Sequence, residues 1–200
     1  SVTDGLSGEG LGLVHKEVSS LTDLPLYFKN NVTIKVKGDA DLSQDDYYVQ
    51  FKTTGETEYG QGVWQEVVKH GIRTNYDTST VPLELVNDNV DSFILRPMKV
   101  ASRIVGDDES NPFASFNGNT ISNVFLFKNR LGFLSNDNVI LSESGFGAVD
   151  STNQMVYNFN RNTVSSFLDS DPIDVSVSSN FVTNLKSANG FQENLILFSE

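Results

Sequence analysis

The chain contains no cysteine among its 200 residues. This absence excludes disulfide bonds, thiolate nucleophiles and cysteine-ligated metal sites, although it does not identify a compartment. Long apolar runs are missing as well, because none approaches the roughly twenty residues that a membrane-spanning helix needs. Residues 1–12 lack the charged and apolar regions of a signal peptide. We therefore expect a soluble chain without a targeting segment.

Most motifs that mark enzymes are also absent. His15 and His70 are the two histidines, and no Gly-x-Ser-x-Gly nucleophile elbow accompanies them. No Gly-Lys dipeptide is present, which excludes a phosphate-binding P-loop. The glycines of residues 8–12 follow no strand and lack the third spaced glycine of a dinucleotide site, so we expect them to belong to a flexible lead-in over residues 1–24. His70, which precedes Gly71, is predicted to be a surface turn residue.

Basic residues are scarce. The chain has 14 lysines and arginines against 26 acidic residues, a net charge of −12. The imbalance is even along the chain, with nine basic and fifteen acidic residues in positions 1–100 and five and eleven in positions 101–200. An evenly acidic surface repels phosphate and disfavours tight nucleic-acid binding, which depends on clusters of lysine and arginine. Double-stranded DNA could still pass such a surface without adhering to it.

The apolar residues that are present follow the period of β-strands. Alternation of apolar and polar positions predicts half-buried strands over residues 32–36, 47–51, 155–159 and 173–177. Two runs, 124–127 and 195–198, are continuously apolar, as in strands covered on both faces. We expect these two runs to lie deepest in the core.

Turn signals agree with an all-β fold. Asn117-Gly118 and Asn189-Gly190 can supply the positive φ of tight hairpin turns, and Ser135 to Asn138 is a polar loop between two apolar segments. Helix signals are limited to a turn or two in residues 19–24, ended by Pro25, and in residues 163–168. The prediction is an all-β chain whose strand content exceeds its helix content at least about twofold.

The sequence pattern changes gradually near residues 96–102, which predicts a boundary between two modules there. Residues 25–100 are predicted to form a β-rich module with its own core, in which Tyr47 and Trp64 pack inward and Tyr48 is the exposed neighbour. Residues 101–200 contain short strands at intervals of about ten residues, which is typical of β-sandwiches and propellers. Exposed aromatic side chains would instead suit a sugar-binding surface, and this alternative stays open.

Two acidic loops resemble metal sites in part. Asp39, Asp41 and Asp45 are spaced like the start of a calcium loop, but Gln44 stands where the turn glycine belongs and Gln50 where the bidentate glutamate belongs. A solvated hairpin loop explains them better. The acidic run of residues 107–109 precedes Asn111-Pro112 and is better explained as an extended, solvated turn. We expect no metal at either loop.

Carboxylate pairs are candidates for glycoside cleavage, which needs two acids about 5 to 10 Å apart on either side of a sugar. Glu143 with Asp150, and Asp169 with Asp171, are such pairs by sequence. With 26 acids in the chain, chance pairs are frequent, and spacing alone selects none of them. Catalysis by these residues is therefore a minor hypothesis.

One long stretch is the most specific feature of the chain. It runs from Val105 to Ser142, VGDDESNPFASFNGNTISNVFLFKNRLGFLSNDNVILS, and is followed by DPIDVSVS from Asp171 to Ser178. These segments resemble the tail tubular protein B family, the nozzle subunits of short-tailed bacteriophages. A weaker resemblance covers the first half, in LTDLP (residues 21–25), VKGDADLSQDDYYVQF (residues 36–51) and GVWQEVV (residues 62–68).

The resemblance implies a structural role without catalysis, cofactor or metal. It implies that the chain is a fragment of a longer virion protein made in the bacterial cytoplasm, and that residues 101–200 contribute blades to a β-propeller. The intact protein would form a hexameric ring, join the tail adaptor and the tail fibres, and line the conduit through which double-stranded DNA leaves the virion. The alternative is a carbohydrate-binding or carbohydrate-cleaving β domain that acts on the bacterial surface.

The resemblance also assigns structural roles to particular residues. Arg130, Gly132 and Phe133 belong to the Asn-Arg-Leu-Gly-Phe hairpin, and Asp171 and Pro172 to the Asp-Pro turn. Arg130 lies in an otherwise apolar segment, where it is either an exposed hairpin charge or the ion-pair partner of a carboxylate. The resemblance favours an ion pair with Asp169 or Asp171.

Overall fold

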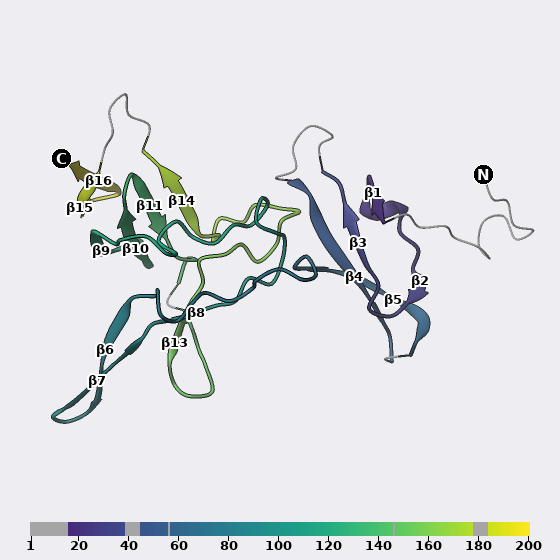
Figure 1. Ribbon diagram of the computed structural model, residues 1–200, viewed down its shortest axis with the longest axis horizontal. Coiled ribbons are helices and arrows are strands. Elements are labelled where there is room, and N and C mark those ends of the chain that lie inside the picture. The colour runs from purple at the N-terminus through teal and green to yellow at the C-terminus, as the bar shows by residue number, and fades with distance from the viewer. Residues whose placement is uncertain (1–15, 39–44, 56, 146, 178–183) are drawn as a thin grey trace, which may run out of the picture. The chain divides into compact units, whose positions relative to one another are not determined.

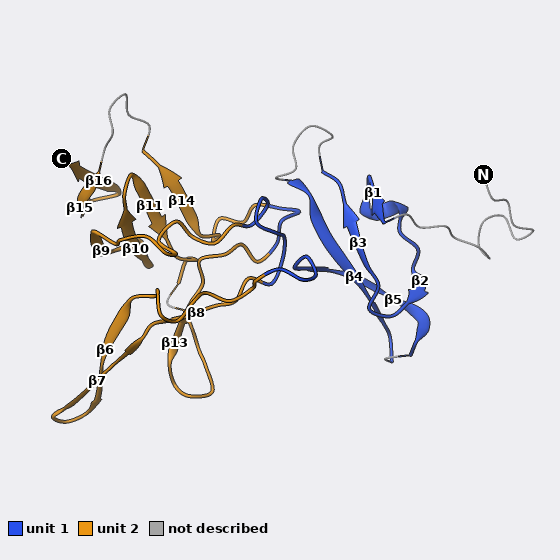
Figure 2. Cartoon of the chain, viewed as in Figure 1, with its two compact units in different colours: residues 1–72, 104–111, 163–166 blue, residues 73–103, 112–162, 167–200 orange. Residues whose placement is uncertain are grey.

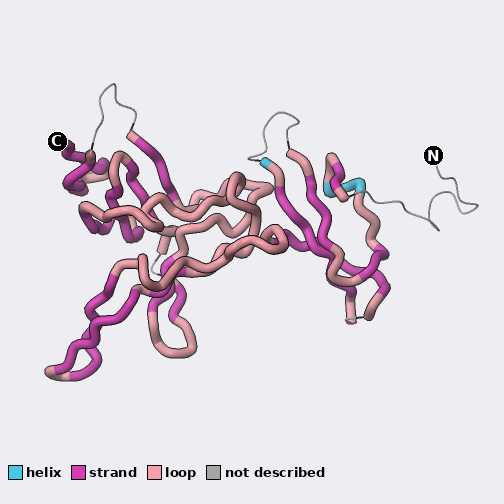
Figure 3. Tube along the Cα trace, viewed as in Figure 1, coloured by secondary structure: helices cyan, strands magenta, loops and turns pink. Residues whose placement is uncertain are grey.

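The structure is a computed structural model that describes residues 16–38, 45–55, 57–145, 147–177 and 184–200. Strands and loops make up nearly all of this part of the chain, as Figures 1 and 3 show. Its regular helical element is the 3-10 turn η1 (Leu21–Asp23), which Ser20 caps. The predicted all-β class and the excess of strand over helix are confirmed. No helix in the described ranges has the length and apolarity to cross a membrane.

The chain divides into two compact units (Figure 2). Unit 1 comprises residues 1–72, 104–111 and 163–166, and unit 2 comprises residues 73–103, 112–162 and 167–200. The boundary expected near residues 96–102 thus falls inside unit 2. Of the expected lead-in, residues 1–15 lie outside the described ranges, whereas residues 16–24 contain strand β1 and η1.

Unit 1 is built on one five-stranded sheet in the order β1-β3-β4-β5-β2. Its strands are β1 (Glu17–Val18), β2 (Tyr27–Lys29), β3 (Thr33–Val36), β4 (Tyr47–Thr53) and β5 (Tyr59–Val67). β1 pairs with β3 in parallel, and the other neighbours are antiparallel. The alternation predicted for residues 32–36 and 47–51 is confirmed, because Ile34, Val36, Val49 and Phe51 are buried.

Trp64 lies among aromatic side chains of unit 1. Its ring centroid is 5.0 Å from that of Phe51 and 5.7 Å from that of Phe28, and its indole N–H donates to the carbonyl of Pro25 at 2.8 Å. The predicted packing of Trp64 and Tyr47 is confirmed, since both lie against the buried cluster of this unit. Tyr48, expected to be exposed, is half-buried, because its hydroxyl bonds to Asp107.

Unit 2 contains an antiparallel four-stranded sheet in the order β14-β11-β10-β9. The strands are β9 (Asn123–Phe127), β10 (Arg130–Ser135), β11 (Asn138–Leu141) and β14 (Ile173–Ser176). Two-residue turns with positive φ connect the first three: Lys128 and Asn129 between β9 and β10, and a turn at Asn136 between β10 and β11. The predicted loop between Ser135 and Asn138 is confirmed as a tight hairpin turn.

Three smaller sheets complete unit 2. One is three-stranded, in the order β12-β13-β8, and the others are the hairpins β6-β7 and β15-β16. Their strands are β6 (Leu83–Asn89), β7 (Ser92–Pro97), β8 (Lys99–Val100), β12 (Ala148–Val149), β13 (Met155–Tyr157), β15 (Leu185–Phe191) and β16 (Asn194–Ser199).

Two buried clusters hold unit 2 together. The larger contains Phe116, Phe133 and Phe159, whose ring centroids lie 5.0 to 5.5 Å apart. The smaller packs Leu134 and Val139 of the four-stranded sheet against the hairpin β15-β16. The two clusters draw on opposite faces of β10, because Phe133 and Leu134 are consecutive residues of one strand.

Several expectations about strands and turns were wrong, including the half-burial predicted for residues 173–177, since all four residues of β14 are exposed. The continuous apolar runs are not covered on both faces: Val124 is 59% exposed and Leu126 68%, and Ile196 and Phe198 are also exposed. Asn189-Gly190 forms no turn but lies inside β15, and the hairpin turns instead after Phe191, where Gln192 has positive φ. Asn117-Gly118 makes a turn within a loop rather than between paired strands.

Candidate functional site

Arg130 is the centre of the site to which the sequence pointed. It begins β10 and is 8% exposed, and its guanidinium binds main-chain oxygens. Nη1 donates to the carbonyls of Ser142 at 2.8 Å, Asp171 at 2.7 Å and Ser170 at 3.3 Å, and Nη2 donates to the carbonyl of Asp169 at 2.7 Å. We call this arrangement the carbonyl cage.

Local structure places the arginine in the cage. The left-handed residues Lys128 and Asn129 close the hairpin and bring Arg130 opposite Phe127. Ser142, just after β11, accepts the Leu131 N–H on its hydroxyl oxygen at 3.0 Å and offers its carbonyl to Arg130. A planar guanidinium with five N–H donors suits several carbonyls at once, which an ammonium group does not.

The expected ion pair of Arg130 with Asp169 or Asp171 is not formed. Arg130 does contact both residues, but through their main chain. Among the described residues, the guanidinium binds the main chain of these aspartates and not their carboxylates. The Asp171 carboxylate instead accepts the Leu168 N–H at 2.9 Å and lies 3.8 Å from Nε of Arg161. The side chain of Asp169 is exposed.

The cage fixes one edge of the four-stranded sheet. The turn of residues 169–172 leads directly into β14, whose Ile173 pairs with Leu141 of β11. By holding the carbonyls of this turn, Arg130 aligns β14 with β11 across 40 residues of sequence, the separation of its bond to Ser170. Pro172 stands before the first paired residue, where its missing N–H costs no sheet hydrogen bond.

Gly132 and Phe133 are both closely packed residues of β10. Gly132 pairs with Phe125 of β9 and Leu141 of β11, and the Phe125 ring lies over its Cα. Phe133 is 1% exposed and packs edge to face on Phe116. Glycine is therefore needed at position 132 for close packing and not for an unusual φ.

Gly132→Ala should destabilise unit 2 by about 1 to 3 kcal/mol, the usual cost of overpacking a filled core. An added Cβ would lie 2.9 Å from Cδ2 of Leu141 and closer still to the Phe125 ring. Urea unfolding of both proteins measures the difference. Gly118→Ala is not a suitable control because Gly118 has positive φ, so we choose Ala148→Ser at an exposed position. A combined Phe125→Leu, Gly132→Ala variant should recover part of the loss, and no recovery would contradict the steric explanation.

In unit 1, Asp107 organises the Gly-Asp-Asp segment. Its Oδ1 accepts the N–H groups of Glu109 and Ser110, each at 3.1 Å, and its Oδ2 accepts the Tyr48 hydroxyl at 3.1 Å. Lys69 approaches the same oxygen at 3.6 Å. Burial alone would raise the pKa of Asp107, but these hydrogen bonds outweigh it and lower the pKa below its usual range. Asp107 thus ties its loop to β4 as a structural anion.

Glu66 of β5 performs a similar task for residues 163–166. Its carboxylate accepts the Thr163 hydroxyl at 2.6 Å, the Val164 N–H at 2.8 Å and the Ser165 hydroxyl. Burial would raise the pKa of Glu66, but the bonds from Ser165, Thr163 and Val164 prevail and lower it. The role of Glu66 could not be predicted from the sequence, because no local pattern marks a contact 98 residues away.

Glu66→Gln should destabilise unit 1 by about 1 to 2 kcal/mol at pH 7, since an amide replaces a charged acceptor of several hydrogen bonds. Because the folded-state pKa lies below the unfolded value, the stabilisation is present above the unfolded pKa and is lost as the pH falls through the folded one. Urea unfolding followed by fluorescence of Trp64, the single tryptophan of the chain, measures this at pH 7 and in acid. The exposed Glu58→Gln is the control. An equal variant effect at both pH values would contradict the assignment.

Arg103 is likewise a residue that no local sequence pattern marks. It is 1% exposed, donates to the carbonyl of Arg73 at 2.6 Å, and lies with its Cζ 4.6 Å from the centre of the Phe113 ring. Arg73 lies at the same distance from that ring. Phe113 belongs to the Asn-Pro-Phe motif, so the motif supplies the aromatic surface for two arginines.

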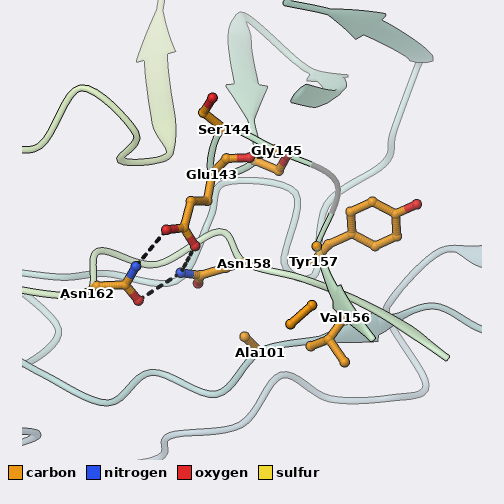
Figure 4. A pocket seen from close by; sticks show the side chains of 11 residues that line it. Ala101, Glu143, Ser144, Gly145, Val156, Tyr157, Asn158 and Asn162 are labelled. Atoms are coloured by element: carbon orange, nitrogen blue, oxygen red, sulfur yellow. Dashed lines mark hydrogen bonds between the residues drawn. The ribbon is translucent and has the colours of Figure 1, made fainter. Parts of the chain in front are cut away.

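A cavity of about 360 Å³ in unit 2 is lined by residues that include Ser142, Glu143 and Tyr157. Glu143 points toward Asn158 and Asn162 at its wall, as Figure 4 shows, and accepts their amide N–H groups at 2.9 and 2.8 Å. Glu143 is the one carboxylate in the described lining, and its proposed partner Asp150 is bound to Lys99 and caps its own turn.

The other candidate residues are placed as follows. His70 is an exposed turn residue before Gly71, as predicted. Asp39 and Asp41 lie outside the described residues, as do His15 and the glycines of residues 8–12. Within the ranges that the structure covers, no three histidine, aspartate or glutamate side chains gather as metal ligands would.

The geometry is that of an all-β structural scaffold. Its motif residues are used to fix strands, turns and loops in an all-β scaffold. The model of the bacteriophage nozzle protein family matches residues 1–200, and the chain belongs to this family. It is 32% identical over 197 residues to the tail tubular protein gp12 of Escherichia phage T7.

The match to the T7 protein spans nearly all of this chain but only part of the T7 protein. It covers 98% of this chain and 23% of the T7 protein. The predicted family is thereby confirmed.

Proposed function

We propose that this chain is part of a subunit of the tubular tail nozzle, which forms the conduit for DNA ejection. The observation that carries the proposal is the family match over all 200 residues. The T7 relative is named a tail tubular protein, and a tube requires repeated subunits with extensive lateral contacts. In this proposal the intact subunit forms a hexameric ring that joins the tail adaptor and the tail fibres, is made in the bacterial cytoplasm, and acts without catalysis.

The charge of the chain supports a conduit. A net charge of −12, with acids spread over both halves, disfavours retention of phosphate on any exposed wall. The sheet β14-β11-β10-β9 is antiparallel and four-stranded, as propeller blades are, which supports a contribution of unit 2 to a β-propeller. Extended, exposed strands supply edges and faces for contacts with other tail proteins.

The test locates the chain in the particle. Antibodies raised against two exposed peptides of unit 2, residues 86–92 and 149–154, should label the tail of purified virions in electron micrographs. Mass measurement of the tail assembled from the intact subunit should give a multiple of the subunit mass. Absence of the chain from washed virions, or labelling of the capsid alone, would overturn the proposal.

The carbohydrate alternative depends on the cavity at Glu143. One carboxylate and one tyrosine are compatible with sugar binding, whereas cleavage by the usual mechanism needs a second acid. Host-surface polysaccharide and peptidoglycan are incubated with the protein and with Glu143→Gln, and reducing ends are measured. Turnover that survives repurification and disappears in the variant would contradict an exclusively structural role.

A further inference from the structure

Two Asn-Gly pairs occur in the chain, and the structure places them in different surroundings. Asn189-Gly190 lies inside β15, where both residues pair with residues of β16. Asn117-Gly118 lies in the loop that leads to β9, where Gly118 has a φ of 80°. An asparagine before glycine loses its side-chain amide more readily than other asparagines, because glycine has no side chain to shield its main-chain nitrogen. The chain thus presents the same reactive pair once in a loop and once in a strand.

The loop leaves the reacting groups of Asn117 and Gly118 without partners. The residues form a turn in which the N–H of Asn117 donates to the carbonyl of Ala114 at 2.8 Å and that of Asn119 to the carbonyl of Phe116 at 3.0 Å. Gly118 is exposed and Asn117 is half-buried. Among the described residues, nothing hydrogen-bonds to the N–H of Gly118 or to the side-chain amide of Asn117. The attacking nitrogen and the group that it attacks are therefore both available.

We propose that Asn117 is a site of spontaneous deamidation through a cyclic imide. The main-chain nitrogen of Gly118 loses its proton and attacks Cγ of Asn117. The new C–N bond closes a succinimide ring, and the amide nitrogen Nδ2 takes up a proton and leaves as ammonia. Water then opens the ring. Attack on Cγ breaks the new bond and gives aspartate, whereas attack on the main-chain carbon breaks the original peptide bond and gives isoaspartate. The net reaction exchanges an amide NH2 for a hydroxyl group of water, so it is balanced without an oxidant or a reductant.

The surroundings of Asn189 oppose the same reaction. Ring closure requires rotation about the bond between Cα and the carbonyl carbon, out of the extended conformation. In β15 this rotation would break the pairing with β16. The hairpin must therefore open locally before Asn189 can react, and the free energy of opening slows the reaction. We expect Asn117 to convert at least about tenfold faster than Asn189.

Conversion at Asn117 alters a loop that adjoins the core of unit 2. Isoaspartate inserts one more carbon into the main chain and adds a negative charge to the loop. The hydrogen bond from the Asn119 N–H to the Phe116 carbonyl spans the altered residue, and Phe116 is 1% exposed in the larger buried cluster. Unit 2 should therefore lose stability as the protein ages. This inference goes beyond the proposed function and does not depend on it.

Peptide mapping by mass spectrometry tests the site. The intact subunit is incubated at neutral and at mildly alkaline pH, in ordinary and in heavy-oxygen water. Its peptides are then sequenced by electron-transfer fragmentation, which distinguishes aspartate from isoaspartate. The peptide that contains Asn117 should incorporate oxygen from the solvent and contain more isoaspartate than aspartate. The rate should rise with pH, because the attacking nitrogen must lose its proton. An unmodified Asn117, or conversion of Asn189 at an equal rate, would overturn the proposal.

Two variants and one peptide complete the test. Asn117→Gln should remain unmodified, because its longer side chain would have to close a larger ring, and its urea midpoint should not change during incubation. The matched control Asn189→Gln should convert at Asn117 and lose stability as the unmodified subunit does. A synthetic peptide of residues 112–122 gives the rate of the same sequence without the fold. If the peptide converts and the folded subunit does not, the loop protects Asn117 and the proposal is wrong. An equal loss of stability in Asn117→Gln would refute the proposed effect on unit 2.

Discussion

Arg130→Ala is expected to destabilise unit 2 by about 3 to 5 kcal/mol. The change removes a buried guanidinium that donates to four main-chain carbonyls, those of Ser142, Asp169, Ser170 and Asp171. A buried acceptor left without a donor costs about 1 to 3 kcal/mol, and a truncated buried side chain also leaves a cavity. Water can reach some of these carbonyls at the surface. The expected loss of stability is therefore smaller than the sum of the separate costs of four unpaired carbonyls.

Two further variants separate the carbonyl cage from an ion pair. Asp169→Asn should change stability by less than about 0.5 kcal/mol, because its exposed side chain takes no part in the cage and its carbonyl remains. Arg130→Lys should recover only part of the loss, because an ammonium cannot span the same set of carbonyls. Urea unfolding followed by circular dichroism measures all three proteins. A loss under about 1 kcal/mol in Arg130→Ala, or a large loss in Asp169→Asn, would contradict the cage.

The location of this site was predictable from the sequence, and its chemistry was not. A basic residue in the apolar Phe-Lys-Asn-Arg-Leu-Gly-Phe segment indicates a special role, and the turn at Asp171 was correctly associated with it. Every residue has a main-chain carbonyl oxygen, so the sequence cannot show which carbonyls accept hydrogen bonds from an arginine. An aspartate near an arginine therefore predicted a carboxylate contact, although the structure uses the aspartate's main chain.

Strand existence was predicted better than strand environment. The alternation in β3 and β4 identified their buried positions because each strand has neighbours on both sides. The run of residues 124–127 has the same apolar content as a central strand but forms β9 at the margin of its sheet. The periodicity shows which positions of a strand are apolar. Whether these positions are covered depends on the order of the strands in the sheet and on contacts with other copies.

The long-range ties of unit 1 could not be predicted from local patterns. Asp107 receives the Tyr48 hydroxyl across 59 residues, and Glu66 receives the Val164 N–H across 98. Both carboxylates sit in sequence surroundings that equally suit a solvated turn or an exposed strand position. Only the fold, which returns residues 104–111 and 163–166 to unit 1, distinguishes them from the many other acids of the chain.

Phe133→Ala is expected to destabilise unit 2 by about 3 to 5 kcal/mol, the usual range for removing a buried phenylalanine. Phe133 is 1% exposed, and its ring packs edge to face on Phe116 at 5.1 Å and stacks on Phe159 at 5.5 Å. Both neighbours are themselves fixed by other elements, so the surroundings can collapse only partly around the missing ring. The aromatic pair contacts add about 0.5 to 1.5 kcal/mol each beyond the buried area.

Hydrogen exchange measured by mass spectrometry localises this effect. Peptides that span β9 to β11 should lose protection in Phe133→Ala, because β10 and β11 contribute Phe133 and Ile140 to the cluster and β9 pairs with β10. Phe133→Leu should retain most of the stability, and Phe198→Ala, at a site 52% exposed, should cost less than about 1 kcal/mol. Fluorescence of Trp64 reports unit 1 separately and shows whether the loss stays within unit 2. Equal losses in Phe133→Ala and Phe198→Ala would show that position 133 is no part of a packed core.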